Sequence, residues 1–211
     1  MGIKNENTKR TAIMKTNIVL IGFMGAGKTE VGRILAKNSG LNFIDLDFLI
    51  ETYEGMAISD IFKRKGEDYF RKLETEIGRE MEKNKSDILS FITKYIDVAT
   101  NSENLLIKEQ CSTWVIATGG GMPVFNDNIK LLKNIGTVIY LKADPKTIYG
   151  RIKNESHRPV LGKSGFSEKD IKDKLDEREK FYKKADIIIY TDGLTMHGTA
   201  DEINIFMGYF S

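Results

Sequence analysis

Residues 22–29 read Gly-Phe-Met-Gly-Ala-Gly-Lys-Thr and match the pattern G-x-x-x-x-G-K-[ST] at every fixed position. They follow an apolar run at 18–21 and precede a helical pattern at 31–36. A strand, a glycine-rich turn and a helix in this order let backbone N–H groups surround a phosphate, and the helix N-terminus adds the positive end of its dipole. Lys28 is expected to reach the β- and γ-phosphates, and the Thr29 hydroxyl to ligate Mg²⁺. The segment therefore predicts a site for a nucleoside triphosphate.

The composition restricts the class of protein. The chain has 211 residues, which suits one compact domain with a sizeable core. Charged residues make up 29% and nearly balance at a net charge of +2, so no basic face argues for nucleic acid. The lone cysteine, Cys111, excludes an internal disulfide framework and suits a reducing cytoplasm. No apolar run is long enough to cross a bilayer and no signal peptide is visible, so we expect a cytoplasmic protein without a membrane partner. We further expect a monomer.

Short apolar runs alternate with helical patterns along the chain. They lie at 18–21, 41–44, 114–117, 137–141 and 186–190. The runs are nearly continuous rather than alternating, which is typical of parallel strands covered on both faces. We therefore predict an α/β fold with helices on both sides of a five-stranded parallel sheet, formed by residues 17–211 as a single domain. Residues 1–16 are polar and are expected to be a disordered extension.

Two helix boundaries can be predicted within this pattern. Asp144-Pro145 resembles an N-cap followed by proline at the first helical position. The last helix is expected at about 199–210, with Ile203, Phe206 and Met207 on one face.

Two carboxylates follow the second apolar run, as Asp45 and Asp47. In open α/β sheets ligands bind outside the carboxyl ends of the strands, so the chemistry is expected just after each run. A strand period of two would point both carboxylates to one side, toward the phosphate loop if the two strands are neighbours. One could then hold Mg²⁺, directly or through water, and the other could accept a proton from a substrate hydroxyl. The alternative is a cap for a helical turn at 48–51.

Two arginines suit the recognition of an anionic small molecule. Gly66 separates two helical patterns and leaves Arg71 near the first turn of the second. Arginine is the residue best suited to two-pronged carboxylate recognition. Arg178 lies near one helical face with Leu175 and Tyr182 and is a second candidate for an anionic group.

A glycine run and a basic loop complete the candidate site. Three consecutive glycines, 119–121, follow the third apolar run and are costly to order. They make sense where the backbone approaches a ligand closely and donates N–H groups, although a plain flexible turn is the alternative. The segment 151–163 starts on a helix and becomes a basic loop that contains Arg158. Loops over phosphoryl-transfer sites often supply an arginine that neutralises developing charge.

In their order along the chain, these motifs resemble those of the shikimate kinase family. The matching pieces are residues 22–29, Asp45-x-Asp47, Gly66-Glu67-x-x-Phe70-Arg71-x-x-Glu74, Gly119-Gly120-Gly121, Arg151, Arg158-Pro159-Val160-Leu161 and Arg178-x-x-x-Tyr182-x-x-x-Asp186. The resemblance covers roughly residues 17–209. A phosphate loop alone is shared by many nucleotide-binding proteins, but the combination is far more specific.

The resemblance implies a three-layer P-loop kinase fold with a substrate-binding subregion near 46–75 and a mobile lid near 154–168. ATP, with Mg²⁺, would phosphorylate the 3-hydroxyl of shikimate and give 3-phosphoshikimate and ADP for aromatic amino-acid biosynthesis. The implied catalytic residues are Lys28, Asp47 and Arg158. Those implied for ATP are Gly25, Ala26, Gly27, Lys28, Thr29, Glu30, Arg151 and Arg158. Those for shikimate are Asp47, Arg71, Gly119, Gly120, Gly121 and Arg178, and those for the metal are Thr29 and Asp45.

The sequence departs from the family in one segment. The stretch from Arg71 to Gly119 is longer than is usual in the family by about two dozen residues, and long unstructured loops are uncommon in compact domains. We place the insertion near 85–110. Apolar residues at helical spacing over 88–99 predict an amphipathic helix, followed by a polar turn at 100–104. We expect this helix to pack on its own core rather than to offer a partner surface.

Two other functions remain open from the sequence. One is a kinase for another hydroxylated carboxylic acid, such as gluconate. The other is a nucleotide-binding protein that has kept the P-loop fold and lost turnover. Arg71, Arg178 and the glycines 119–121 favour shikimate over another acid. Asp47, Arg71 and Arg178 favour a working kinase, because a silent relative would be expected to lose these acceptor-side residues.

Overall fold

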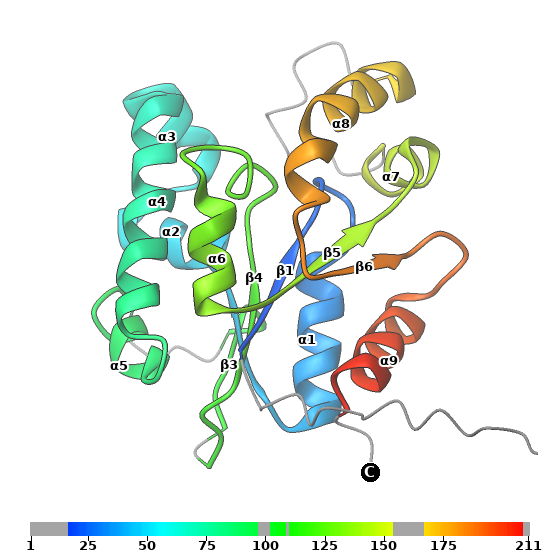
Figure 1. Cartoon of the computed structure of the whole chain (residues 1–211). Coiled ribbons are helices and arrows are strands. Elements are labelled where there is room, and N and C mark those ends of the chain that lie inside the picture. Colours follow the sequence, from blue (N-terminus) through cyan, green and yellow to red (C-terminus); the bar gives the residue numbers. More distant parts are fainter. Residues whose placement is uncertain (1–16, 97–101, 109, 154–166, 209–211) are drawn as a thin grey trace, which may run out of the picture.

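The computed structural model describes residues 17–96, 102–108, 110–153 and 167–208. A six-stranded sheet in the order β3-β2-β4-β1-β5-β6 forms its centre (Figure 1). The strands are β1 (Asn17–Ile21), β2 (Asn42–Asp45), β3 (Leu105–Leu106), β4 (Trp114–Ala117), β5 (Gly136–Lys142) and β6 (Ile187–Tyr190). Neighbouring strands pair in parallel except β2 and β3, which are antiparallel.

The prediction of five parallel strands is wrong by one strand. The additional strand, β3, is only two residues long and pairs with the edge of β2 in the register Phe43↔Leu106 and Ile44↔Leu105. The apolar run at 105–107 is too short to predict a strand by its pattern, so the pairing with β2 identifies β3. The other five strands lie where the apolar runs predict them, to within one residue at each end.

Helices cover both faces of this sheet, as predicted. They are α1 (Lys28–Ser39), α2 (Leu46–Glu54), α3 (Ile58–Lys65), α4 (Glu67–Lys83), α5 (Ile88–Ile92), α6 (Asn128–Ile135), α7 (Pro145–Ile152), α8 (Glu168–Tyr182) and α9 (Met196–Met207). Within β1, Ile18 and Leu20 pack with α1 and α9, whereas Val19 and Ile21 pack with the helices of the other face. This division follows from the period of two along a strand.

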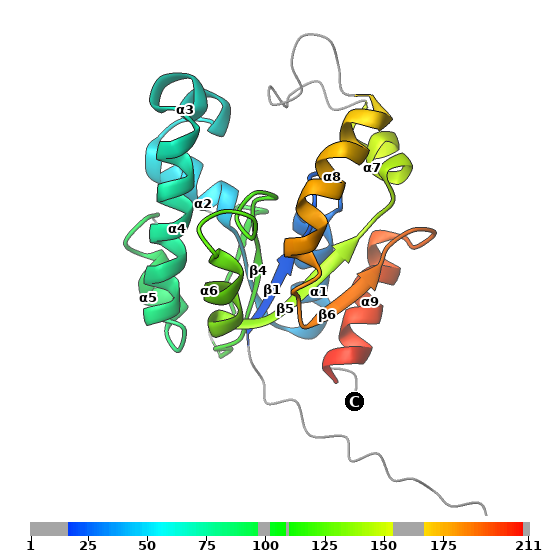
Figure 2. The same ribbon diagram turned by 45° about the horizontal axis from the view of Figure 1, so that its top comes forward.

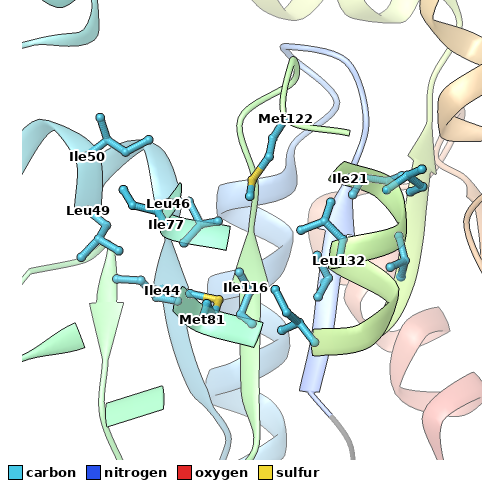
Figure 3. Close-up of a cluster of buried hydrophobic side chains, with 14 of the residues drawn as sticks. Ile21, Ile44, Leu46, Leu49, Ile50, Ile77, Met81, Ile116, Met122 and Leu132 are labelled. Atoms are coloured by element: carbon cyan, nitrogen blue, oxygen red, sulfur yellow. The ribbon is translucent and has the colours of Figure 1, made fainter. Parts of the chain in front are cut away.

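The larger of the two cores joins the strands to α2, α4 and α6. Figure 3 shows Ile44 and Leu46 near Ile77 and Met81, with Ile116 and Leu132 further along the same layer. All of these side chains are buried. Burial at roughly 25 cal/mol per Å² of apolar surface stabilises this packing and fixes α2 and α4 against the sheet, and these two helices carry several of the predicted site residues.

The segment predicted as an insertion forms only the first part of its predicted helix. Helix α5 begins at Ile88 as expected but ends at Ile92, and the residues up to Ile96 form turns instead of further helix. The turns bury Ile96 in the main core and allow the Tyr95 hydroxyl to donate to Glu80 Oε2 at 3.0 Å. Helix α5 therefore packs on the main core and not on one of its own.

Two smaller expectations can also be judged. Pro145 opens α7 as predicted, with Asp144 before it in extended conformation. The last helix begins three residues earlier than predicted and ends at Met207. Ile203 and Met207 are buried, whereas Phe206 is 52% exposed, so Phe206 does not join them in the core. Within the described ranges, no helix combines the length and hydrophobicity that a membrane span requires.

The carboxyl ends of the strands meet beneath two groups of helices. Figures 1 and 2 show α3 with the upper end of α4 on one side of this edge and α7 with α8 on the other. The phosphate loop, residues 22–29, emerges from β1 between the two groups. The topology thus places the ends of β1, β2 and β4 next to one another, as expected for a ligand site in an open α/β sheet.

Candidate active site

The phosphate loop adopts the predicted strand–turn–helix conformation. Gly27 is the N-cap of α1 and has a φ of 90°, which glycine adopts without strain. Lys28 is buried, and its Nζ donates to the carbonyl oxygens of Gly22 and Phe23 at 3.0 Å each. These bonds hold the ammonium group across the loop. The backbone N–H groups at the start of α1 and this ammonium are together suited to bind phosphate oxygens.

A cavity of about 280 Å³ opens over this loop. It is lined by Met24, Gly25, Gly27, Lys28, Thr29, Glu30, Asp45, Asp47, Thr118, Gly120, Arg151 and Met196. The residues predicted for phosphate binding all line it except Ala26, which is buried, and Arg158, which lies outside the described residues. Arg151 Nη1 donates to the carbonyl oxygens of Gly25 and Ala26 at 3.3 Å, so this arginine lies against the loop.

The two predicted metal residues are in contact. The Thr29 hydroxyl donates to Asp45 Oδ2 at 2.6 Å. Asp45 Oδ1 accepts from the backbone N–H groups of Asp47 and Phe48 at 2.8 and 3.3 Å, so Asp45 also caps α2. Asp45 therefore caps α2, as in the alternative interpretation, and it also lines the phosphate cavity.

Asp45 and Asp47 reach the phosphate loop for a different reason from the one predicted. Strand β4 lies between β1 and β2, so the two strands are not neighbours. Asp47 lies in the first turn of α2 and not on a strand, so a period of two does not describe it. The two carboxylates approach the phosphate loop because α2 begins directly at the end of β2.

Asp47 lies where two cavities meet. It lines the phosphate cavity and also a larger one of about 680 Å³. Burial, followed by the negative charges of Asp45 and Glu74, raises the pKa of Asp47 to about 7, while the positive charge of Lys28 opposes the shift. A carboxyl group with this pKa exchanges a proton readily at neutral pH, which suits a general base.

The larger cavity, which we call the acceptor cavity, is formed between the two groups of helices in Figure 2. From α2, α3 and α4 it is lined by Asp47, Glu51, Ile58, Ser59, Phe62, Lys63, Glu67, Phe70, Arg71 and Glu74, and from elsewhere by Met24, Ala57, Gly119, Gly120, Gly121, Lys174 and Arg178. Every residue predicted for the acceptor substrate is among them.

Arg71 is held rigidly at one wall of the acceptor cavity. Its Nη1 donates to Glu74 Oε2 at 2.7 Å and its Nη2 to Glu67 Oε1 at 2.9 Å. The guanidinium carbon lies 4.4 Å from the centre of the Phe125 ring. A Cβ atom on Gly121 would lie 2.2 Å from Nη1. The absence of a side chain at 121 therefore makes room for the arginine itself.

The first glycine of the run has a similar role. A Cβ atom on Gly119 would lie 2.6 Å from Asp47 Oδ1 and 2.9 Å from Glu74 Oε1. The sequence predicted that these glycines allow the backbone to approach a ligand. They line the acceptor cavity, but at 119 and 121 they also make room for the acidic and basic side chains of the site.

Arg178 reaches the acceptor cavity from the opposite side, on α8. Its guanidinium carbon lies 5.5 Å from the centre of the Phe23 ring, within the phosphate loop. Two cationic groups on different helices thus converge on one cavity, as the sequence predicted.

Several residues that line the site have no role predicted from the sequence, among them Glu74, Met24 and Met196. Glu74 is buried, and its Oε1 has no hydrogen-bond partner among the described residues. Its position three residues after Arg71, on the same helical face, was a usable signal. Met24 lines both cavities and Met196 lines the phosphate cavity from the start of α9. Neither methionine has a local pattern that could have identified it. The predicted lid lies, at 154–166, outside the described residues.

Comparison with known proteins identifies the family of the chain. The family model described as shikimate kinase matches residues 24–92 and 100–207. The shikimate kinase of Persephonella marina is 37% identical over 187 residues, which cover 89% of this chain and 96% of that protein. The shikimate kinase of Thermodesulfovibrio yellowstonii is 40% identical over 187 residues, covering 89% and 92%.

A solved structure agrees with these sequence relatives. The shikimate kinase of Acinetobacter baumannii in complex with shikimate superposes with a TM-score of 0.72 at 29% identity, covering 94% of this chain and 96% of that one. The fold, the phosphate loop, the acceptor cavity and these relatives lead to one conclusion: the chain belongs to the shikimate kinase family.

Proposed function

We propose that this protein transfers the γ-phosphoryl group of ATP to the 3-hydroxyl of shikimate, giving 3-phosphoshikimate and ADP, a step of aromatic amino-acid biosynthesis. The observation that carries the proposal is the position of Asp47, whose carboxylate lines both the phosphate cavity and the acceptor cavity. A hydroxyl held at Asp47 would face a phosphoryl group held by the loop.

The acceptor cavity offers what shikimate requires. Shikimate has one carboxylate and three ring hydroxyls. Arg71 and Arg178 provide cationic donors for the carboxylate, and arginine can bind a carboxylate with two parallel hydrogen bonds. Asp47 provides an acceptor for a hydroxyl, and the backbone at 119–121 lines the wall between them.

The transfer itself needs positioning, charge neutralisation and one proton acceptor. The acceptor oxygen attacks the γ-phosphorus as its proton passes to Asp47. The bond from the γ-phosphorus to the bridging oxygen breaks, and the electron pair leaves with ADP. Lys28 and the N–H groups of the loop offset the negative charge on the phosphate oxygens.

The residues present fit a magnesium ion. Thr29 and Asp45 offer oxygen ligands side by side, 2.6 Å apart, at the phosphate cavity. Mg²⁺ is usually bound by one or two protein oxygens together with substrate phosphates and water. When bound, the ion would neutralise charge on the β- and γ-phosphates.

Two arginine roles are proposed on the resemblance to the family. Arg151 would cover the adenine, and its contact with the phosphate loop at 3.3 Å supports a place at the nucleotide site. Arg158 would neutralise charge on the transferred phosphoryl group from a lid near 154–168.

The proposal is tested by measuring ADP release with Mg²⁺-ATP and shikimate, with quinate, gluconate and AMP as parallel acceptors. Turnover with shikimate that is lost in Asp47→Asn supports both the substrate and the site. Preferred turnover with gluconate would retain the phosphate chemistry and contradict the acceptor. ATP binding with no turnover on any acceptor would favour a silent nucleotide-binding protein.

A further inference from the structure

A buried tyrosine connects α8 to the glycine run. Tyr182 is the last residue of α8 and has no solvent-exposed surface. Its hydroxyl donates to the carbonyl oxygen of Gly120 at 2.6 Å. Gly120 is 62 positions away in sequence and lines both cavities. The hydroxyl therefore contacts the backbone at a residue that lines both the phosphate cavity and the acceptor cavity.

The same tyrosine is adjacent to Arg178. The two residues are four positions apart on one helix and so lie on the same face. Burial raises the pKa of Tyr182 to about 12, against an opposing effect of Arg178 through its charge and a side-chain hydrogen bond. The hydroxyl thus keeps its proton at neutral pH and remains a donor to the carbonyl oxygen of Gly120.

Gly120 also lies against the phosphate loop. A Cβ atom on Gly120 would lie 3.3 Å from Met24 N and 3.4 Å from the carbonyl oxygen of Gly22. On the other side, the Arg178 guanidinium lies 5.5 Å from the Phe23 ring of the same loop. Arg178 is therefore located by the phosphate loop through Phe23 and by the glycine run through Tyr182.

We propose that Tyr182 is a positioning residue for the acceptor substrate. Its hydrogen bond to Gly120 fixes the position of Arg178 relative to the glycine run, so that the substrate carboxylate and the reacting hydroxyl are bound at the correct distance from each other. This inference rests on the proposed function, because it assumes an acceptor whose carboxylate binds Arg178. The hydroxyl of Tyr182, and not its ring, is responsible for the effect on shikimate binding.

The neighbouring tyrosine provides a matched control. Tyr140 on β5 is also buried, and its ring centre lies 5.1 Å from that of Tyr182. Its hydroxyl has no hydrogen-bond partner among the described residues. Removing either hydroxyl as phenylalanine keeps the ring and the packing, but only Tyr182→Phe removes a contact with the site.

The experiment compares Tyr182→Phe and Tyr140→Phe with the wild-type protein in steady-state kinetics and thermal unfolding. We expect Tyr182→Phe to raise KM for shikimate by about fivefold to tenfold, as the loss of one hydrogen bond predicts, and to leave KM for ATP within about twofold. Tyr140→Phe should leave both KM values within about twofold. Adding Tyr182→Phe to Arg178→Lys should raise KM for shikimate by less than the product of the two single effects, because both changes disturb the same carboxylate contact.

Each contrary result has a distinct meaning. An unchanged KM for shikimate in Tyr182→Phe, with normal turnover by the wild-type protein, overturns the inference alone. An equal rise in KM for both substrates, or unfolding of Tyr182→Phe at a temperature at which Tyr140→Phe stays folded, also overturns it, because the hydroxyl would then serve general stability. Absence of shikimate turnover by the wild-type protein contradicts the proposed function and the inference with it.

Discussion

The Thr29 hydroxyl donates a 2.6 Å hydrogen bond to the Asp45 carboxylate. Thr29 follows β1 and Asp45 ends β2, and β4 lies between these two strands in the sheet. This bond joins the phosphate loop to the start of α2, the helix that carries Asp47. The nucleotide side and the acceptor side of the site are thus coupled through two side chains. A change at Thr29 should therefore affect turnover beyond the loss of a single metal ligand.

We expect Thr29→Val to lower kcat by about 100-fold or more, because valine keeps the shape of threonine but offers neither a metal ligand nor a donor to Asp45. Thr29→Ser retains the hydroxyl and should remain within about tenfold of the wild-type rate. The measurement is turnover as a function of Mg²⁺ concentration for both variants. Equal activity of the valine and serine variants would show that the hydroxyl is not used.

The pH dependence of kcat/KM for shikimate should report the ionisation of Asp47. Because the pKa of Asp47 is raised to about 7, the group is protonated below that pH and cannot accept a proton, so kcat/KM should rise as pH increases through about 7. Glu74→Gln removes a negative charge that contributes to this shift, and the rise should then occur at lower pH. A profile that Glu74→Gln leaves in place, or moves to higher pH, would contradict the assignment.

Asp47 should also reduce the stability of the protein at alkaline pH. Its ordinary pKa is 3.8, so between about 4 and 7 the folded state binds more protons than the unfolded state, and the free energy of unfolding falls as pH rises. The Asp47→Asn variant does not lose free energy of unfolding in this way, because asparagine does not ionise. It should therefore be more stable than the wild-type protein at pH 8, by at most about 4 kcal/mol. The difference in Tm should shrink between pH 8 and pH 5. A difference that is independent of pH would show that the carboxyl group is not perturbed.

Gly121→Ala should impair acceptor binding without unfolding the protein. The new Cβ would lie 2.2 Å from Arg71 Nη1, and Gly121 is not among the glycines with positive φ, so the clash displaces the guanidinium and does not strain the backbone. We expect KM for shikimate to rise by about tenfold or more, with Tm changed by only a few degrees. Gly150→Ala, in α7, is the control, since nothing lies within 4 Å of its added Cβ. A similar KM in both variants would contradict the role given to Arg71.

Arg158→Ala should reduce turnover more than nucleotide affinity, if Arg158 neutralises charge that develops during transfer. We expect kcat to fall by about a thousandfold and the Kd for ATP to change by less than tenfold. Nucleotide titration beside turnover measures the two effects. An equal loss in both would assign Arg158 to ground-state ATP binding.

Features that depend on residues near one another in sequence could be predicted. The phosphate loop, five of the six strands and the break at Gly66 follow from local patterns of glycine and apolar residues, because backbone conformation and burial on a sheet act over a few positions. Some local predictions are nevertheless wrong: Asp47 lies in the first turn of α2 and not on a strand, and the helix that begins at Ile88 ends at Ile92.

What sequence patterns could not show are the contacts between distant segments. Arg71 lies against Gly121, the Tyr182 hydroxyl bonds to Gly120, and Asp47 lies at the junction of two cavities only because parallel strands bring their carboxyl ends to one edge. The same holds for β3, which exists only through its pairing with β2. Local sequence patterns name most of the charged groups of the site, such as Lys28, Asp47 and Arg71. Their distances, and the shift of the Asp47 pKa, arise from burial and charge that only the packed structure brings together.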